Sequence, residues 1–127
     1  MSGPEARAAA ALAAAKADAL GAVWNLVEGA GELPLAEGPL TGVTLGVKAN
    51  LAVKDLPWHG GIKGYDGWLA GADAVPVARL KAAGAAVICT LAMEEGALGA
   101  VTDNPAFGRC LNPLGEGLTP GGSSGGS

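Results

Sequence analysis

The sequence predicts an α/β protein whose sheet is covered on both faces. A segment of helical pattern ends at Gly84 and leads directly into the apolar run Ala86–Cys89. Such a short, continuous apolar run is what a strand buried on both faces needs. At 127 residues, with 50% hydrophobic and 16% charged residues, the chain has the composition of one globular domain at most.

The first expected element is a helix at the amino terminus. Ser2 and Glu5 have the spacing of a capping box, with Pro4 in the first turn. The alanine-rich run 8–15 favours helix, and the charges around it argue against a targeting peptide. We expect this helix to continue to Gly29, because apolar residues recur at helical spacing along one face, namely Leu20, Val23, Trp24 and Val27.

Strands are expected between residues 43 and 53. Val43, Leu45 and Val47 alternate with smaller residues, and the run Leu51–Val53 is apolar again. This pattern fits two short strands or one interrupted strand. The glycine-rich segment 58–65 that follows is typical of a loop.

A second helix is expected from Ala72 onward. Pro76 suits the first turn of this helix, and the spacing of Val77 and Leu80 places both on its buried side. Gly84 is expected to end it and to lead into the buried strand.

Charge and cysteine content exclude several classes of protein. The net charge of -4 and the scattered Lys and Arg residues give no basic surface for nucleic acid. No segment is long and apolar enough to be expected to cross a membrane. Cys89 and Cys110 lie far apart, and His59 is the single histidine, so neither a disulfide framework nor a zinc site is indicated. Two free thiols predict a cytoplasmic protein.

Two features have both a structural and a functional interpretation. Lys48, at the end of the first expected strand, is either a solvated strand end or a buried base, since burial favours the neutral amine that accepts protons. The closing segment Gly121–Ser127, GGSSGGS, has the composition of a flexible linker but can equally form a loop of a catalytic site. The local sequence leaves both questions open.

Four blocks of sequence bear on these alternatives. They are GVKAN at 46–50, DAVPVARLKAAGA at 73–85, TDNPAFGRCLNP at 102–113 and TPGGSSGGS at 119–127. In their order and spacing they resemble the amidase signature family, and the resemblance covers the chain from about Gly38 to its end. The resemblance implies that residues 38–127 form the amino-terminal portion of an amidase signature domain, with a mixed sheet covered by helices on both faces and incomplete in this chain. Residues 1–37 would form an N-terminal helix and linker, and GGSSGGS would be native sequence.

The resemblance also implies a Ser, cis-Ser, Lys triad. Lys48 matches the base and Ser123 the middle serine, whose peptide bond is cis in the family. The serine that is acylated, in a D-x-G-G-S block, would lie beyond residue 127, so we expect these residues alone to be inactive. Ala97 lies where the family lines the substrate cleft with backbone, which would make it a substrate-binding residue together with Gly121 and Gly122. The alternative for Ala97 is a small residue packed in a turn.

Other positions match no part of the triad. Many members have Asp between the lysine and the asparagine of the first block, whereas Ala49 stands here. His59 is expected to be a surface histidine of a loop. Asn104 and Asn112 are expected to bind nearby backbone in turns.

The function that the resemblance implies is hydrolysis of a carboxamide C–N bond, in a small-molecule amide, through an acyl-enzyme. Neither a metal nor an organic cofactor is implied, and no direct nucleic-acid or membrane partner is expected. One alternative is the amidase subunit of a tRNA-dependent amidotransferase, which releases ammonia from glutamine for partner subunits. The other is an inactive truncated product or pseudoenzyme. A homo-oligomer and an assembly with amidotransferase subunits both remain open.

Overall fold

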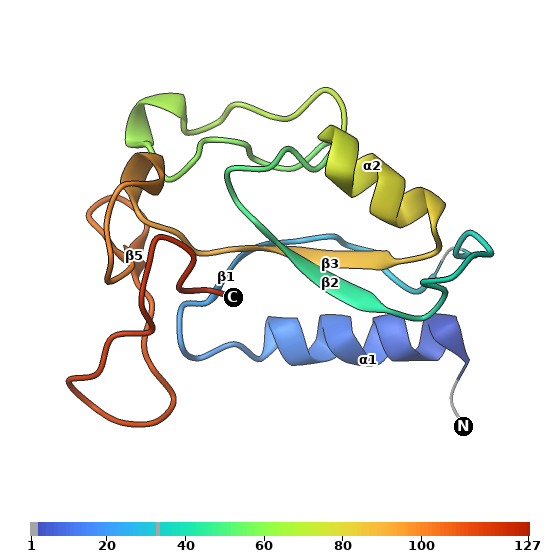
Figure 1. Ribbon diagram of the computed structural model, residues 1–127, viewed down its shortest axis with the longest axis horizontal. Helices are drawn as coiled ribbons and strands as arrows, with labels where there is room; N and C mark the ends of the chain where they lie inside the picture. Colours follow the sequence, from blue (N-terminus) through green and yellow to red (C-terminus); the bar gives the residue numbers. More distant parts are fainter. Residues whose placement is uncertain (1–2, 33) are drawn as a thin grey trace.

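A computed structural model describes residues 3–32 and 34–127. In it, a sheet of three strands lies between two helices (Figure 1). α1 (Pro4–Lys16) lies along one face of the sheet, and α2 (Val75–Ala82) lies on the other. The expectation of an α/β fold with helices on both faces of a mixed sheet is confirmed.

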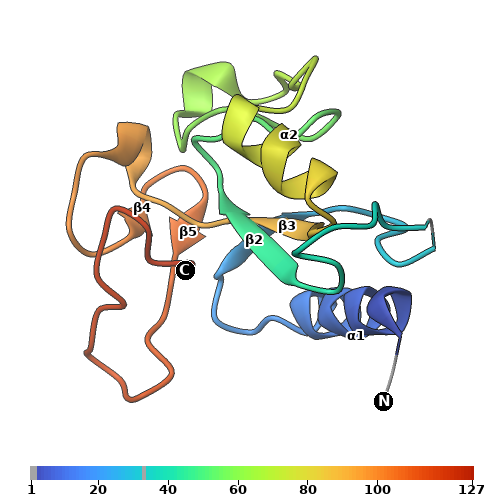
Figure 2. The same cartoon turned by 45° about the vertical axis from the view of Figure 1, so that its right-hand side comes forward.

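β3 (Ala86–Leu91) is the central strand. It pairs with β1 (Val23–Leu26) in antiparallel fashion and with β2 (Thr44–Lys48) in parallel fashion. In the register of the sheet, Leu91 lies opposite both Lys48 and Val23. The carboxyl ends of β2 and β3 and the amino end of β1 therefore meet at one edge of the sheet, and Figure 2 shows β2 and β3 between the two helices.

The remaining elements are short. They are the 3₁₀ helices η1 (Lys63–Tyr65) and η2 (Glu95–Ala97) and the antiparallel pair β4 (Asp103–Asn104) and β5 (Gly108–Arg109). Most of these elements lie on the left of the sheet in the view of Figure 1.

Two clusters of buried side chains lie on opposite faces of β3. Ala8 and Leu12 of α1 pack against Ile88 on one face, while Val77 of α2 packs with Val87 on the other. Successive side chains of a strand point to opposite faces, so the single strand supplies both clusters. The small alanine side chains of α1 let this helix lie close to the sheet.

The amino-terminal helix is shorter than its sequence pattern predicted. It begins at Pro4, as expected, and ends at Lys16. The carboxylate of Asp18 then accepts hydrogen bonds from the backbone N–H groups of Leu20 and Val23, both at 3.0 Å, and turns the chain into β1. The predicted helical face over 20–27 is therefore wrong: pairing with β3 outweighs the helical spacing of its apolar residues. The expected capping box includes Ser2, which lies outside the described residues.

The other expected elements also need small corrections. Only one strand, β2, forms in the region 43–53, because the backbone N–H of Leu51 donates to the carbonyl of Lys48 and turns the chain. In α2 the prediction for Val77 is confirmed, with 1% of its surface exposed. The prediction for Leu80 is wrong, since Leu80 is 36% exposed.

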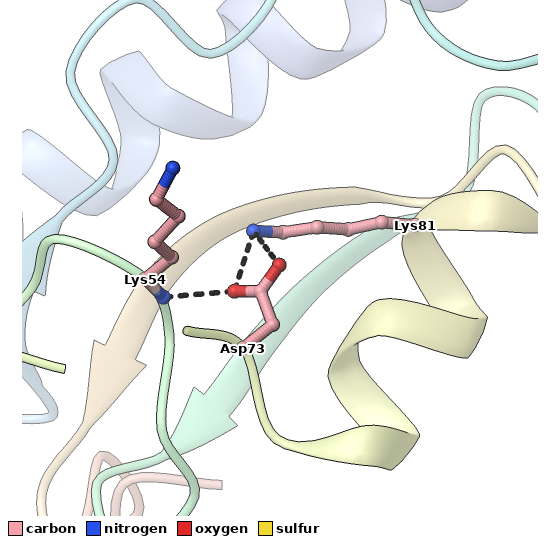
Figure 3. Close-up of polar contacts among 3 residues, drawn as sticks. All are labelled: Lys54, Asp73 and Lys81. Atoms are coloured by element: carbon pink, nitrogen blue, oxygen red, sulfur yellow. Dashed lines mark hydrogen bonds and ion pairs between the residues drawn. The ribbon is translucent and has the colours of Figure 1, made fainter. Parts of the chain in front are cut away.

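Asp73 connects the segment after β2 to α2 (Figure 3). Its carboxylate accepts hydrogen bonds from the backbone N–H of Lys54 at 2.8 Å and from Lys81 Nζ at 2.9 Å. Partial burial alone would raise the pKa of this carboxyl, but the hydrogen bonds and the two lysine charges outweigh it and hold the pKa below its usual value. Both partners are structural, so this charged group supports the fold and is not a candidate for catalysis.

Cys89 and Cys110 are both buried and free. Within residues 3–32 and 34–127, no helix has the length and apolar character needed to cross a membrane.

The first prediction concerns the cluster under α2. Val77→Ala should lower the free energy of unfolding by about 2 kcal/mol, because it removes buried methyl groups and leaves a cavity. Val75→Ala, two residues earlier in the same helix and 63% exposed, should change it by less than about 0.5 kcal/mol. Urea denaturation followed by tryptophan fluorescence measures both, and equal effects of the two changes would contradict the packing described here.

Candidate active site

The structure brings Lys48 and Ser123 into contact. Lys48 is the last residue of β2, and Ser123 lies in the carboxyl-terminal loop 119–127. Lys48 Nζ donates a hydrogen bond to Ser123 Oγ at 2.6 Å, across 75 residues of sequence. The Gly122–Ser123 peptide bond is cis.

The chain that continues from β3 holds the loop. The backbone N–H of Glu94 donates to the carbonyl of Ser123 at 3.1 Å. Three residues further along the loop, the N–H of Gly126 donates to the carbonyl of Ala92 at 3.1 Å, and the N–H of Ala92 donates to the carbonyl of Ala22. Ser123 is therefore fixed by main-chain hydrogen bonds to the extension of the central strand.

The glycines of this loop allow close packing. A Cβ at Gly122 would lie 2.7 Å from the backbone of Ala100. A Cβ at Gly126 would lie 2.6 Å from both the carbonyl oxygen of Ala22 and the backbone nitrogen of Ala92. A real Cβ essentially never lies this close to another heavy atom, so a side chain at either position would push the loop away from the backbone that it contacts. The segment GGSSGGS is a packed loop of the structure.

Two buried polar side chains surround the loop. Glu94 is 7% exposed, and its Oε1 accepts hydrogen bonds from the N–H groups of Val101 at 2.8 Å and Thr102 at 2.6 Å. Thr102 is fully buried; its Oγ1 donates to the carbonyl of Gly121 at 2.7 Å and accepts from the N–H of Gly125 at 3.0 Å. Sequence analysis did not single out either residue. Thr102 opens one of the four blocks, but no pattern in the sequence indicates that its hydroxyl reaches the loop.

The expected substrate-binding residues lie around the same loop. Gly121 and Gly122 directly precede Ser123 in the loop. Ala97 ends η2, three residues after Glu94, and its backbone N–H donates to the carbonyl of Glu94. Their assignment to substrate binding stays a prediction.

A cavity lies beside the segment that follows Lys48. It has a volume of about 360 Å³ and is lined by Asn50, Trp58, His59, Gly60, Tyr65 and Trp68. Trp58 Nε1 donates to the carbonyl of Asn50 at 3.1 Å and so fixes one wall of the cavity. Its walls are mainly aromatic and apolar.

His59 is buried, so its expected place on the surface is wrong. It is 5% exposed and stacks on Phe107 with ring centroids 4.0 Å apart, and Trp24 lies against it. Its Nδ1 accepts a hydrogen bond from the N–H of Gly61. Burial lowers the pKa of His59, and the charge of Asp66 opposes this only in part, so the ring is neutral near pH 7.

The asparagines of the third block behave as expected. Asn104 Oδ1 accepts from the backbone N–H groups of Ala106 and Phe107, and Asn112 Oδ1 accepts from that of Leu114. Over the part of the chain that the structure describes, no group of three or more His, Cys, Asp or Glu side chains is arranged to hold a metal ion.

The fold and the four sequence blocks point to the same family of proteins. The chain belongs to the Amidase family, whose sequence profile matches residues 6–127.

Individual relatives agree with this family. A glutamyl-tRNA(Gln) amidotransferase component of Methanospirillum hungatei JF-1 is 43% identical over 96 residues, which cover 76% of this chain and 22% of the relative. A solved amidase is 35% identical with a TM-score of 0.82, covering 99% of this chain and 32% of that enzyme. The peptide amidase from Stenotrophomonas maltophilia is 25% identical with a TM-score of 0.84, covering 99% of this chain and 30% of that enzyme. The chain thus spans well under half the length of each.

The second prediction tests the buried carboxylate. Glu94→Ala should lower the free energy of unfolding by about 3 kcal/mol, because it leaves the N–H groups of Val101 and Thr102 without an acceptor. Glu95→Ala, at an exposed neighbouring position, should change it by less than about 0.5 kcal/mol. Chemical denaturation of both variants measures the difference, and a loss below about 1 kcal/mol for Glu94→Ala would contradict its structural role.

The third prediction concerns pH. Because the folded-state pKa of His59 lies below its unfolded value of about 6.5, the unfolded chain binds a proton first as the pH falls. The contribution of the neutral ring is therefore fully present above about pH 6.5 and is lost as the pH falls through the lowered folded pKa. Urea midpoints at pH 7.5 and pH 5 should differ more for the wild type than for His59→Phe. Equal differences, or an NMR pKa of His59 above 6.5, would contradict this.

Proposed function

We propose that Lys48 and Ser123 supply the base and the proton relay of an amidase, which cleaves a carboxamide C–N bond through an acyl-enzyme. The observation that carries the proposal is the 2.6 Å contact between Lys48 Nζ and Ser123 Oγ in a chain of the amidase family. We further propose that the attacking serine lies beyond residue 127, as the family's motif order implies.

In the first half of this reaction, the attacking serine oxygen bonds to the carbonyl carbon of the substrate. A serine hydroxyl is a weak nucleophile until a base removes its proton. That proton passes to Ser123 Oγ while the hydroxyl proton of Ser123 passes to Lys48 Nζ. A neutral amine has a lone pair for this purpose, and a 2.6 Å contact lets either group donate.

In the second half, the proton returns along the same path. The Lys48 ammonium gives a proton to Ser123, whose own proton goes to the departing amine nitrogen as the C–N bond breaks. Protonation of the leaving group is what amide cleavage requires. Water then hydrolyses the resulting ester by the same relay, and neither a metal nor an organic cofactor takes part.

Among the described residues, Lys48 Nζ contacts the hydroxyl of Ser123 and takes part in no ion pair. Across residues 3–32 and 34–127, no carboxylate oxygen lies within 4.0 Å of Lys48 Nζ; the ion pairs are made by Lys16 and Lys81. The neighbouring Ala49, where many family members carry Asp, is buried.

The substrate is proposed to be a small-molecule amide, held beside the loop by the backbone of Ala97, Gly121 and Gly122. Backbone N–H and C=O groups there can bind the amide without side chains that restrict its size. We propose that the reaction takes place in the cytoplasm, which suits the free thiols of Cys89 and Cys110.

A second candidate function is that of the amidase subunit of a tRNA-dependent amidotransferase. It is favoured by the 43% identity to the amidotransferase component of Methanospirillum hungatei JF-1. The two candidates differ in their need for partners. Turnover of simple amides by the complete protein alone would favour the stand-alone amidase, whereas glutamine hydrolysis that requires co-purified subunits would favour the amidotransferase.

The fourth prediction tests the proton relay in the complete protein. Lys48→Ala should abolish amide hydrolysis, with a loss of several orders of magnitude in kcat, because the nucleophile's proton has no acceptor. Ser123→Ala should leave a small residual rate, since a water molecule can take the place of the hydroxyl. Lys63→Ala, at an exposed lysine of η1, is the matched control and should keep wild-type kcat.

Release of ammonia or amine at neutral pH measures all three variants. Wild-type turnover by Lys48→Ala would show that Lys48 is only a strand-end lysine and would overturn the proposal.

A further inference from the structure

We propose that Thr102 is a positioning residue that sets Ser123 against Lys48, and that Glu94 holds Thr102 in the required place. This inference rests on the proposed function, because it assigns Thr102 a part in proton transfer by way of Ser123. Thr102 contacts neither Lys48 nor the reacting atoms in this proposal; it acts through the loop.

The hydroxyl of Thr102 joins the two sides of the Ser123 turn. It donates to the carbonyl of Gly121 at 2.7 Å and accepts from the N–H of Gly125 at 3.0 Å. These two residues lie two positions before and two positions after Ser123. One hydroxyl group therefore fixes the width of the turn that presents Ser123 Oγ.

This bridge uses the single donor of the hydroxyl group and one of its two acceptor lone pairs. Thr102 is 0% exposed, so solvent has no direct access to the bridging side chain. Valine at this position would keep the shape of threonine but leave the carbonyl of Gly121 and the N–H of Gly125 without this partner. Serine would keep both bonds. A comparison of the two substitutions therefore separates the role of the hydroxyl from the role of the methyl group.

Glu94 connects the threonine to the central strand. Its Oε1 accepts the N–H of Thr102 at 2.6 Å, and its own N–H donates to the carbonyl of Ser123 at 3.1 Å. Thr102 has a φ of 53°, a region that β-branched residues rarely occupy. The charge-assisted hydrogen bond from its N–H to the carboxylate offsets the energetic cost of that conformation. Glu94 therefore bonds to both the positioning residue and the residue that it positions.

Loss of the bridge should affect chemistry more than binding. A proton relay through a 2.6 Å contact depends on the placement of Ser123 to within a fraction of an ångström. A displacement of about 1 Å can cost about 100-fold in rate. The expected signature is a fall in kcat with little change in KM.

The experiment compares Thr102→Val and Thr102→Ser in the complete protein, with Thr90→Val as the matched control. Thr90 is also buried, at 1% exposure, and its Oγ1 accepts a hydrogen bond from Asn25 at 2.9 Å. Thr102→Val should lower kcat by about 10- to 100-fold with KM within about threefold of wild type. Thr102→Ser should restore kcat to within about threefold, and Thr90→Val should reduce thermal stability without this loss of kcat.

Hydrogen exchange of the Gly125 and Glu94 amides provides a readout that does not need turnover. Both amides should exchange faster in Thr102→Val than in wild type, and at wild-type rates in Thr102→Ser and Thr90→Val. Should Thr102→Val fail to fold, Gly125→Ala replaces it, because the added methyl group would overlap Thr102 Oγ1.

The possible failures are distinguishable. If the wild type hydrolyses amides and Thr102→Val, or Gly125→Ala in its place, keeps full kcat, the positioning role is overturned while the proposed function stands. A loss of kcat in Thr102→Ser as large as in Thr102→Val would also overturn it, since the hydroxyl would not be the group that matters. If wild type and Lys48→Ala are equally inactive, the proposed function fails, and unchanged exchange in Thr102→Val would then overturn the loop-holding role as well.

Discussion

The hydrogen bond between Lys48 and Ser123 is the contact on which the arrangement of the site depends. Its two partners are 75 residues apart, and one strand fixes both of them. β3 pairs with β2 and so places Lys48 opposite Leu91. The chain that continues from Leu91 then binds the loop through the carbonyl of Ala92 and the N–H of Glu94. The register of this parallel strand pair therefore brings the loop to the end of β2 that carries Lys48.

The two helices stabilise that strand from opposite sides. α1 contributes mostly alanines, and its buried Ala8 and Leu12 pack against the face of β3 that carries Ile88. α2 covers the other face, where Val47 of β2 lies in the same cluster as Val77. Val47 directly precedes Lys48, so the packing that holds the helix also holds the end of the strand that carries the proposed base.

The sequence predicted the parts of this fold that rest on local signals. Pro76, Gly84 and the apolar run after it identified α2 and β3 because capping and apolar continuity are properties of neighbouring residues. β1 was missed because its pairing with β3 and the Asp18 turn are not visible in the spacing of apolar residues. The burial of His59 was missed for the same reason, because its aromatic neighbours, Trp24 and Phe107, come from distant parts of the chain.

The candidate site shows the same limit in a different form. Resemblance to the family identified Lys48 and Ser123, since both stand in short blocks of sequence. Nothing in those blocks indicates that Thr102, rather than Thr119, is the threonine that bridges both sides of the Ser123 turn. That choice depends on a buried carboxylate, Glu94, that binds two successive N–H groups and brings the hydroxyl under the loop.

The composition of the loop explains why main-chain contacts dominate there. A run of glycine and serine is typical of a flexible linker, yet Gly122 and Gly126 lie too close to the main chain of Ala100, Ala92 and Ala22 to accept a Cβ. The glycines thus allow the loop to lie close to the neighbouring main chain, and the alanines that they contact there are small as well. Because backbone lies directly on backbone, the main chains of three segments, and not the packing of large side chains, determine where Ser123 lies. A hydroxyl such as that of Thr102, which bonds only to main-chain groups, is suited to fix such a loop.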